Sequence, residues 1–536
     1  MTFDPLILFI VIPVTAGLLS LLLLGRPWVA RAVGTLSLLS LLALAVSLLV
    51  VGHLRGPGLI FTTQLGGWPA PFGITLVFDA LSGLLLAPAM LVALSCYIHS
   101  FSSLERATER RYFHPLAQLL VFGVNLSFLT GDLFNLFVAF EVMLMASYAL
   151  LAIGAKRKQL TQAYKYVLLN LMASTVFVAS AGMVYGMFGT LNIAHLTAIV
   201  RHTVEAGEQL PTGFTGLAVL LLLVFGLKGA FFPLWFWLPD TYYTCPIALG
   251  AWFGGTLTKV GVYAVARLFP FAFAQGEGGA AVIMPIIAIS AAFTMFLGVL
   301  GAVSQHEVRR ILAIHVISQV GYMVFGIAVM TPLALAGCVF YMIQHMIVKA
   351  SLFLCCGVME RHAGTDDLDH LGGMLKKRVW LGVLFLVAAM SLVGLPPLSG
   401  FFGKLVIIRE GWSDHWWLSV IGLATGALTL LSMMKIFSYA FWSPAPAAAA
   451  PVTSVDIPRQ PGKSWAPAYV GIVMLVVAAV GVGLGAEPIY RVAEVAGRQM
   501  HDPTDYIQAV APLGAPAVGV PVDETRMAWD AQEAMR

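Results

Sequence analysis

The chain has 536 residues, of which 10% are charged and 59% are hydrophobic, and its mean hydropathy is +0.89. Soluble domains carry about 25% charged residues, so this composition excludes a water-soluble globule. The net charge of +4 is small and no basic run is interleaved with aromatic residues, so we expect no nucleic-acid partner. The five cysteines lie mostly in apolar segments without CxxC spacing, so we expect no disulfide framework, bound metal or other cofactor.

Membrane-spanning helices are expected wherever about 20 mostly apolar residues follow one another. The first run follows an N-terminus without a basic region, so we interpret it as a retained span rather than a signal peptide. The runs are continuous instead of alternating with a period of two, which predicts helices and not a barrel. Fourteen spans are predicted, at residues 4–24, 29–52, 76–98, 113–130, 133–154, 163–189, 214–238, 247–270, 280–302, 309–330, 333–358, 379–408, 416–441 and 465–486.

Lysine and arginine residues alternate between the loops that join these spans. The odd-numbered loops hold clusters such as Arg106–Arg111 and Lys376–Arg378, whereas the even-numbered loops hold chiefly Arg55, Arg201 and Arg409. Positive loops stay in the cytoplasm. The pattern therefore predicts a multi-pass protein embedded in the lipid bilayer with both termini outward. The seventh loop, Asp240–Pro246, is the exception because it has no basic residue.

The predicted spans and the segments between them divide the chain into six parts. Residues 442–464 are rich in proline and alanine and are interpreted as a cytoplasmic linker. Residues 487–536 are polar and are expected to form a tail with a short helix and an extended arm. The remaining parts are the N-terminal spans (1–112), a first five-span repeat (113–270), a second five-span repeat (280–441) and the last span (465–486).

Seven of the ionisable residues inside predicted spans are candidates for a function. An ionised side chain at the bilayer centre costs at least about 2.5–3.5 kcal/mol, so such residues usually have a partner and a function. Together they form a candidate polar path through an apolar bundle. They are Glu141 in span five, Lys228 in span seven, Lys259 in span eight, His315 in span ten, His345 and Lys349 in span eleven, and Lys404 in span twelve.

Each of these positions also has a purely structural interpretation. Glu141 with Lys228 can be a buried structural pair, and His315 can be a packing residue. His345 and Lys349 are four residues apart and share one helix face. Two basic groups placed together repel each other, which is unfavourable for stability and suited to passing a proton. Outside this set, Lys165 and Lys435 can reach the membrane interface by snorkelling.

Two of the lysine-bearing spans contain helix-breaking residues. Span seven continues through Pro233 and Pro239, and span twelve contains Pro396 and Pro397 shortly before Lys404. Proline inside a helix removes a backbone hydrogen bond, so each helix should be interrupted close to its lysine. Paired interrupted helices mark the ion path and an inverted repeat in transporters. Since spans seven and twelve are five apart, the sequence predicts two inverted units, spans four to eight and nine to thirteen.

Five motifs, which follow one another in the family's order, resemble the antiporter-like subunits shared by Mrp-type cation/proton antiporters and respiratory complex I. Among these subunits, the sequence is most similar to the D-type subunits of Mrp antiporters. The motifs are GDLFNLFVAFE (131–141), FPLWFWLPD (232–240), LTKVGVY (257–263), RILAIHVISQVGY (310–322) and HMIVK (345–349). The resemblance implies fourteen helices with two inverted five-helix repeats.

The resemblance also implies a role for each matching residue. Glu141 matches the family's span-five glutamate and Lys228 its partner lysine in the broken span. Lys259 matches the connecting lysine of span eight, and His345 with Lys349 the pair that links two half-channels. Lys404 matches the terminal lysine of span twelve. The resemblance therefore implies a secondary transporter subunit of the prokaryotic inner (plasma) membrane. This subunit would move protons and assemble with the other subunits of a complex that exchanges protons for Na+.

Three alternatives remain open from the sequence. The chain can be a proton-pumping membrane subunit of a complex I-like, hydrogenase-linked or inorganic-carbon-uptake complex. It can be a scaffold that carries no ions. It can also be a membrane transferase, for which the acidic cluster Asp366, Asp367 and Asp369 is the best candidate site.

Overall fold

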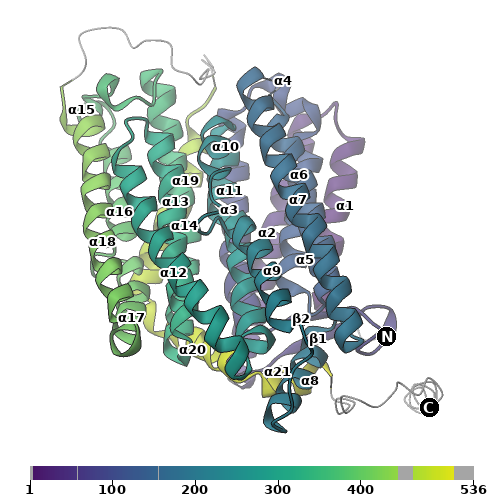
Figure 1. Cartoon of the computed structure of the whole chain (residues 1–536). Coiled ribbons are helices and arrows are strands. Elements are labelled where there is room, and N and C mark those ends of the chain that lie inside the picture. The colour runs from purple at the N-terminus through teal and green to yellow at the C-terminus, as the bar shows by residue number, and fades with distance from the viewer. Residues whose placement is uncertain (1–3, 57, 155, 445–462, 512–536) are drawn as a thin grey trace.

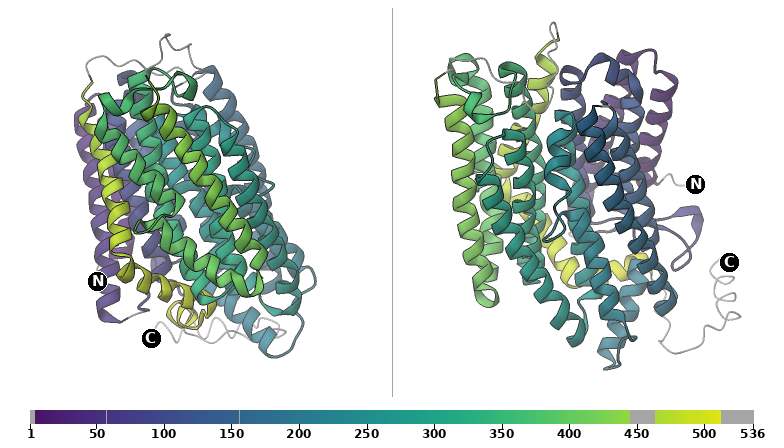
Figure 2. Two further views of the ribbon diagram at one scale, coloured as in Figure 1. Left: turned by 90° about the vertical axis from the view of Figure 1, so that its left-hand side faces the viewer. Right: turned by 45° about the horizontal axis from the view of Figure 1, so that its top comes forward.

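The computed structural model describes residues 4–56, 58–154, 156–444 and 463–511. Its long helices run roughly parallel to one another, with α12–α18 on one side of the molecule and α1–α7 on the other (Figures 1 and 2). The long helices are α1 (Leu8–Leu22), α2 (Pro27–Arg55), α3 (Ala80–Ser103), α5 (His114–Leu129), α6 (Leu133–Ala152), α7 (Arg157–Phe188), α9 (Phe214–Gly229), α11 (Ile247–Leu268), α12 (Gly276–Val303), α13 (Val308–Val329), α14 (Pro332–Ala363), α16 (Val379–Val393), α17 (Ser399–Asp414), α18 (Trp416–Phe437) and α19 (Ala466–Leu484).

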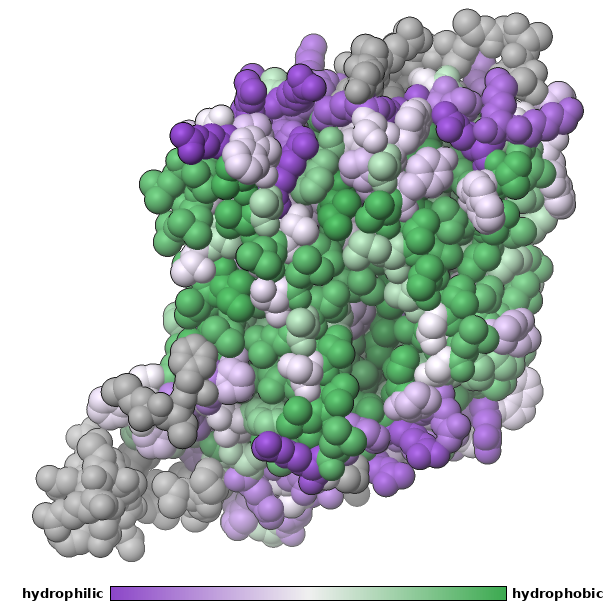
Figure 3. Space-filling model, turned by 180° about the vertical axis from the view of Figure 1, so that it is seen from behind, coloured by the Kyte–Doolittle hydropathy of each residue, from purple (hydrophilic) through white to green (hydrophobic). Residues whose placement is uncertain are grey.

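On the face shown in Figure 3, a broad band of hydrophobic side chains lies between two hydrophilic ends. Eleven helices in the described part of the chain are long and apolar enough to cross a membrane. The shorter apolar helices α9 and α16 belong to the two predicted broken spans. Each of the fourteen predicted segments contains a helix, but α11 is not among those eleven, so the number of crossings stays a prediction.

The third predicted span starts too early. Thr75–Phe78 forms strand β2, which pairs antiparallel with β1 (Phe61–Gln64). Helix α3 starts only at Ala80, because the Asp79 carboxylate caps it by accepting a hydrogen bond from the Ser82 N–H at 2.9 Å. The threonine and valine that precede this cap favour an extended backbone.

The predicted loop Asp240–Pro246 is also wrong, since most of it belongs to helix α10 (Leu238–Thr244). Helix α9 ends at Gly229, where Ala230 takes a left-handed backbone conformation with φ of +58°. Pro239 then lies in the first turn of α10, where its missing N–H leaves no helical hydrogen bond unmade.

The prediction that both lysine-bearing spans are interrupted is confirmed. In span twelve, α16 stops before Gly394, which has φ of +95°, and α17 starts at Ser399. Lys228 lies in the last turn of α9, and Lys404 lies in the second turn of α17. Each lysine is therefore within about two turns of a helix end that lies inside the molecule.

The same order of helices occurs twice along the chain. Helices α5, α6, α7, the broken pair α9 and α10, and α11 are followed by α12, α13, α14, the broken pair α16 and α17, and α18. The third member has 32 residues in both series, and the last member has 22 residues in both. The two series therefore match in the order of their helices and in the lengths of their third and last members.

The connections within the two series also match. The Leu133 N–H donates to the Leu191 carbonyl at 2.8 Å, and the Val308 N–H donates to the Asp366 carbonyl at 2.9 Å. In each case a loop that follows the 32-residue helix pairs with the start of the second helix. The first series differs by an additional helix, α8 (Ile193–Glu205), and its third helix starts at Arg157 instead of the predicted residue 163.

The C-terminal segment crosses the end of the molecule at which β1, β2 and α8 lie (Figures 1 and 2). Helix α20 (Ala486–His501) packs against α14 and α3, and α21 (Thr504–Val510) packs against α8 and β1. The predicted helix in the tail is therefore present and lies on the chain's own bundle. Most of the predicted linker (445–462) and the end of the tail (512–536) lie outside the described residues. The short helices α4 (Arg106–Thr108) and α15 (Met374–Lys377) lie at the opposite end.

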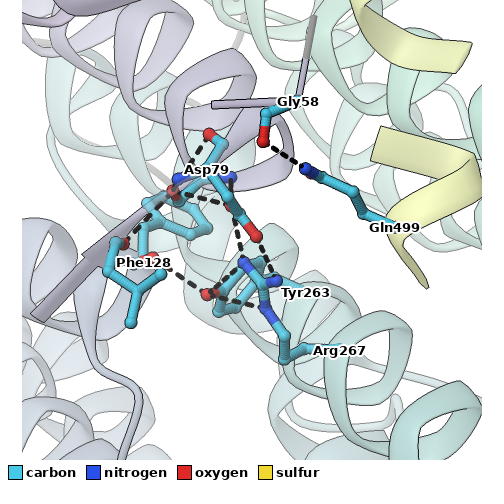
Figure 4. A network of polar contacts seen from close by, with 8 residues as sticks. Gly58, Asp79, Phe128, Tyr263, Arg267 and Gln499 are labelled. Atoms are coloured by element: carbon cyan, nitrogen blue, oxygen red, sulfur yellow. Dashed lines mark hydrogen bonds and ion pairs between the residues drawn. The ribbon is translucent and has the colours of Figure 1, made fainter. Parts of the chain in front are cut away.

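A buried ion pair connects α3 with α11 near the C-terminal segment (Figure 4). The guanidinium of Arg267 donates to both carboxylate oxygens of Asp79, with 2.8 Å between Nη2 and Oδ1. The guanidinium carbon also lies 5.3 Å from the ring centre of Tyr263 and 5.1 Å from that of Tyr506 on α21. The Tyr263 hydroxyl in turn donates to the Phe128 carbonyl at 2.9 Å. One arginine thus joins α3, α11 and α21.

Removing the carboxylate of this pair should strongly destabilise the protein. Asp79→Ala leaves Arg267 charged, buried and without its anion, which typically costs about 3–5 kcal/mol. Denaturant unfolding of the purified protein in detergent measures this loss. Arg201→Ala is the matched control, because it removes the more exposed pair between Arg201 and Asp502 and should cost no more than about 1 kcal/mol. Equal losses in both variants would contradict the proposed structural role of Asp79.

Candidate functional site

All seven predicted site residues lie on helices of the two series. Glu141 on α6 is half-buried, and the other six side chains are buried. The structure does not join them into one continuous chain of contacts. It arranges them in three groups: Glu141 with Lys228; Lys259 with His345 and Lys349; and Lys404 with His315.

In the first group, a serine hydroxyl lies between the carboxylate and the lysine. The ammonium of Lys228 donates to Ser174 Oγ at 3.3 Å, and the Ser174 hydroxyl donates to Glu141 Oε1. Among the described residues, Glu141 and Lys228 form no ion pair within 4.0 Å. The Lys228 ammonium also lies 5.2 Å from the ring centre of Phe140. The expected direct pair is therefore a bridged pair.

Ser174 was not identified from the sequence. It lies on α7 in an apolar run, where a serine usually bonds its own helix. Ser180 on the same helix does so, donating to the Val176 carbonyl at 2.8 Å. The two serines look alike in the sequence, and only their positions relative to α6 and α9 separate them.

The helix break beside Lys228 is packed against α11. The Trp237 indole N–H donates to the Leu227 carbonyl at 2.9 Å, so a side chain from the segment before α10 caps the end of α9. A Cβ atom on Gly261 would lie 2.5 Å from the backbone nitrogen of Gly229. The glycine therefore lets α11, which carries Lys259, lie directly against the broken end of α9.

The central group contains basic residues only. Lys259 Nζ donates to the Gly254 carbonyl at 2.5 Å and to Thr258 Oγ1 at 3.2 Å, and Lys349 Nζ donates to the Leu312 carbonyl at 3.2 Å. His345 interacts electrostatically with both lysines. Neither ring nitrogen of His345 has a hydrogen-bond partner in the described part of the chain. The hydrogen-bonding capacity of this imidazole is therefore unused in the described structure.

Lys404 in the third group is held by the second helix break. Its ammonium donates to the Leu392 carbonyl at 2.9 Å and to the Val393 carbonyl at 3.1 Å, which are at the end of α16. It also lies 4.5 Å from the ring centre of Tyr322 and 5.7 Å from that of Tyr341. The lysine thus occupies the negative end of a helix dipole, a favourable site for a cation.

A series of polar side chains leads from His315 towards Lys404. His315 Nε2 lies 2.8 Å from Ser432 Oγ, and His315 Nδ1 lies 3.3 Å from Ser318 Oγ. The Gln319 amide donates to Ser318 Oγ at 2.9 Å and accepts from the Tyr341 hydroxyl at 2.5 Å. Gln319 lies inside one of the five motifs, but the sequence assigned it no role.

The two ambiguous lysines lie outside this arrangement. Lys165 is exposed on α7. Lys435 donates to the carbonyls of Val303 and Gln305 at 3.2 and 2.8 Å, so it caps the end of α12. Among the described residues, no group of three or more histidine, cysteine or acidic side chains is placed to hold a metal ion. Lysine and histidine side chains can each bind and release a proton.

Comparisons with known proteins agree with this arrangement. Residues 130–429 match the family described as NADH:quinone oxidoreductase/Mrp antiporter, transmembrane part. The D-type subunit of the Na(+)/H(+) antiporter of Alkalihalophilus pseudofirmus is 42% identical over 506 residues, which cover 94% of this chain and 98% of that protein. The D-type antiporter subunit of Bacillus subtilis is 36% identical over 509 residues, 94% of this chain and 99% of that protein.

Among solved structures, a chain of the Mrp complex from Dietzia sp. superposes with a TM-score of 0.84 at 30% identity, covering 95% of this chain and all of that one. A chain of an archaeal membrane-bound sulfane sulfur reductase superposes with a TM-score of 0.83 at 22% identity, which shows a common fold. The resemblance inferred from the five motifs is confirmed. The chain belongs to the NADH:quinone oxidoreductase/Mrp antiporter family of membrane subunits.

Proposed function

We propose that this chain is the proton-translocating subunit of a multisubunit Na+/H+ antiporter of the plasma membrane, working with other subunits of that complex. The observation that carries the proposal is the match over 94% of the chain to proteins named as D-type subunits of such antiporters. The buried basic groups of the two series supply a matching chemistry. The proposal makes the chain a secondary transporter subunit rather than an enzyme.

A second candidate is a proton-pumping subunit of a complex I-like assembly. A chain of respiratory complex I from Thermus thermophilus superposes with a TM-score of 0.76, but at 23% identity this likeness concerns the fold alone. The higher identity to the Mrp chain favours the antiporter. The same residues would carry protons in both assemblies, so the site proposals below hold for either.

The two helix series are proposed to be inverted repeats, each forming half of a proton path. Matching helix lengths, matching interruptions and matching connections support this division of residues 113–270 and 280–441. The first half would begin at Glu141 and Lys228, and the second half would end at Lys404. Lys259, His345 and Lys349 lie between the halves.

In the first half, the bridged pair would control the proton on Lys228. A carboxylate near a buried ammonium stabilises it, and an isolated ammonium in a low-dielectric interior is strongly disfavoured. When Glu141 and Ser174 hold Lys228, the lysine keeps its proton. When the carboxylate moves away, Lys228 gives the proton to water on the way to Lys259.

Backbone carbonyls explain why the later lysines can hold and then release a proton. A carbonyl oxygen accepts a hydrogen bond from an ammonium but does not take its proton. Lys259, Lys349 and Lys404 are each held in this way without a carboxylate partner within 4.0 Å among the described residues. The proton would therefore move on only when a water molecule or the next basic group reaches the lysine.

Removing either end of the bridged pair should abolish transport. In Glu141→Ala or Lys228→Ala, the lysine loses its counter-ion or the path loses its first proton carrier. Cation-dependent proton flux in everted membrane vesicles measures the effect, with assembly of the complex checked by co-purification. Normal flux in an assembled variant would remove the pair from the mechanism.

Ser174→Ala should reduce the flux about tenfold or more, because a hydrogen bond to a charged group contributes roughly 1.5–3 kcal/mol. Ser174→Thr keeps the hydroxyl and should restore most of the flux. Ser180→Ala is the matched control on the same helix, since that hydroxyl bonds only its own backbone. If Ser174→Ala and Ser180→Ala have equal flux, the bridge has no role in transport.

Lys404→Ala distinguishes a transporter from a scaffold. A scaffold would lose at most some stability, whereas a proton path would lose its terminal carrier and its flux. Lys435→Ala is the control, because Lys435 caps α12 outside the proposed path. Vesicle flux normalised to assembled complex measures both. Unchanged flux in Lys404→Ala would contradict the proposed exit.

A further inference from the structure

A second titratable site lies at the predicted cytoplasmic end, outside the path described above. The side chain of Asp366 is only 1% exposed, and neither carboxylate oxygen has a hydrogen-bond partner in the part of the chain that the structure describes. Its main-chain carbonyl accepts from the Val308 N–H, so the residue is held in place. A buried carboxylate without a partner is costly when ionised. The position therefore favours a protonated side chain.

Charged and titratable groups from two helices face Asp366. Helix α14 contributes Glu360 and Cys356, and α13 contributes Arg309 together with Glu307 at its start. Burial, followed by the charge of Glu360, raises the pKa of Asp366 to about 7, against the opposing effect of Arg309. Asp366 is thus neutral below about pH 7 and ionised above it.

Arg309 is already fully engaged while Asp366 is neutral. Its Nε and Nη2 atoms donate to the two carboxylate oxygens of Glu360. Its Nη1 atom donates to the Cys245 carbonyl at 3.0 Å and to the Tyr243 carbonyl at 3.3 Å. These two carbonyls lie at the C-terminal end of α10. The guanidinium of Arg309 on α13 therefore links α10 to both α13 and α14.

We propose that Asp366 is a cytoplasmic proton-binding site whose ionisation weakens the hold of Arg309 on α10. Once ionised, Asp366 is a second carboxylate within electrostatic reach of the same guanidinium. It competes for the donors of Arg309. The bonds from Nη1 to the neutral α10 carbonyls are weaker than the charge-assisted bonds to the Glu360 carboxylate, so they are the ones that this competition would break first. Loss of one proton to the cytoplasm is the only chemical change required.

The broken helix connects this site to the proposed path. The segment that leads into α10 contains Trp237, whose indole N–H caps the end of α9 at the Leu227 carbonyl, next to Lys228. Loosening α10 at high cytoplasmic pH would change the surroundings of Lys228. This functional consequence depends on the role proposed for Lys228, whereas the release of α10 does not.

The rate at which Cys245 reacts with a thiol reagent measures the release of α10 from Arg309. Cys245 is buried and follows α10, and its carbonyl is bound by Arg309. The assembled complex is treated with N-ethylmaleimide between about pH 6 and pH 8, and modification of Cys245 is quantified by peptide mass spectrometry. The wild-type rate is divided by the rate in Asp366→Asn, which cancels the intrinsic increase of thiolate with pH.

The ratio of the wild-type labelling rate to the Asp366→Asn rate should rise by up to roughly tenfold between about pH 6 and pH 8. The reason is that the ionised fraction of a group with a pKa of about 7 rises by that factor over this pH range. Asp369→Asn is the matched control, since Asp369 is exposed and pairs with His306; its rate should follow that of the wild type at every pH. A flat ratio for Asp366→Asn, or an equal effect of Asp369→Asn, would overturn the proposal.

Two further variants keep the test decisive. Asp366→Ala is also locked in a neutral state and replaces Asp366→Asn if that variant does not assemble. The labelling is repeated in Lys228→Ala. The ratio here is the labelling rate with Asp366 divided by the rate with Asp366→Asn, both in the Lys228→Ala background. If this ratio still rises with pH, the Asp366 site stands even where the proposed role of Lys228 fails. If the ratio is flat in the wild-type background while wild-type proton flux is normal, only the Asp366 site fails.

Discussion

A backbone carbonyl that is freed inside a bilayer needs a hydrogen-bond donor, and at the two helix breaks of this protein side chains supply it. The Lys404 ammonium binds the last two carbonyls of α16, and the Trp237 indole binds the Leu227 carbonyl in the last turn of α9. A helix break without a donor would be costly, and so would a lysine without an acceptor. At the second break, the freed carbonyls of α16 and the buried ammonium of Lys404 therefore stabilise each other.

The groups along the path differ in the charge they can carry. The first contains a carboxylate, a hydroxyl and a lysine, so a positive charge on Lys228 is balanced locally. The later groups are basic throughout, and His345 interacts electrostatically with Lys259, Lys349 and Lys404. Neighbouring positive charges repel in a low-dielectric interior. A proton on one of these groups thus disfavours a proton on the next, which would link the proton occupancy of the two proposed halves.

A buried arginine–carboxylate pair links helices at each end of the bundle, whereas the seven candidate residues between the two ends are held less firmly. Arg267 with Asp79 joins α3, α11 and α21 at one end, and Arg309 with Glu360 joins α10, α13 and α14 at the other. Such bidentate pairs fix geometry as well as charge. Between them, His345 has no fixed partner among the described residues, and Lys228 is held through a single hydroxyl. Small rearrangements are therefore easiest where the proton is proposed to move.

The sequence by itself determined the approximate positions of the long helices, the two places where a span breaks and the seven candidate ionisable residues on these helices, because apolar length, proline and glycine act locally along the chain. It did not separate Ser174 from Ser180, recognise Asp240–Thr244 as helix, or distinguish the orphaned Asp366 from the exposed Asp369. These features were decided by the tertiary structure. A hydroxyl or carboxyl group obtains its partners from helices far away in the sequence, and the packing of those helices sets which side chains meet and which are left without a partner.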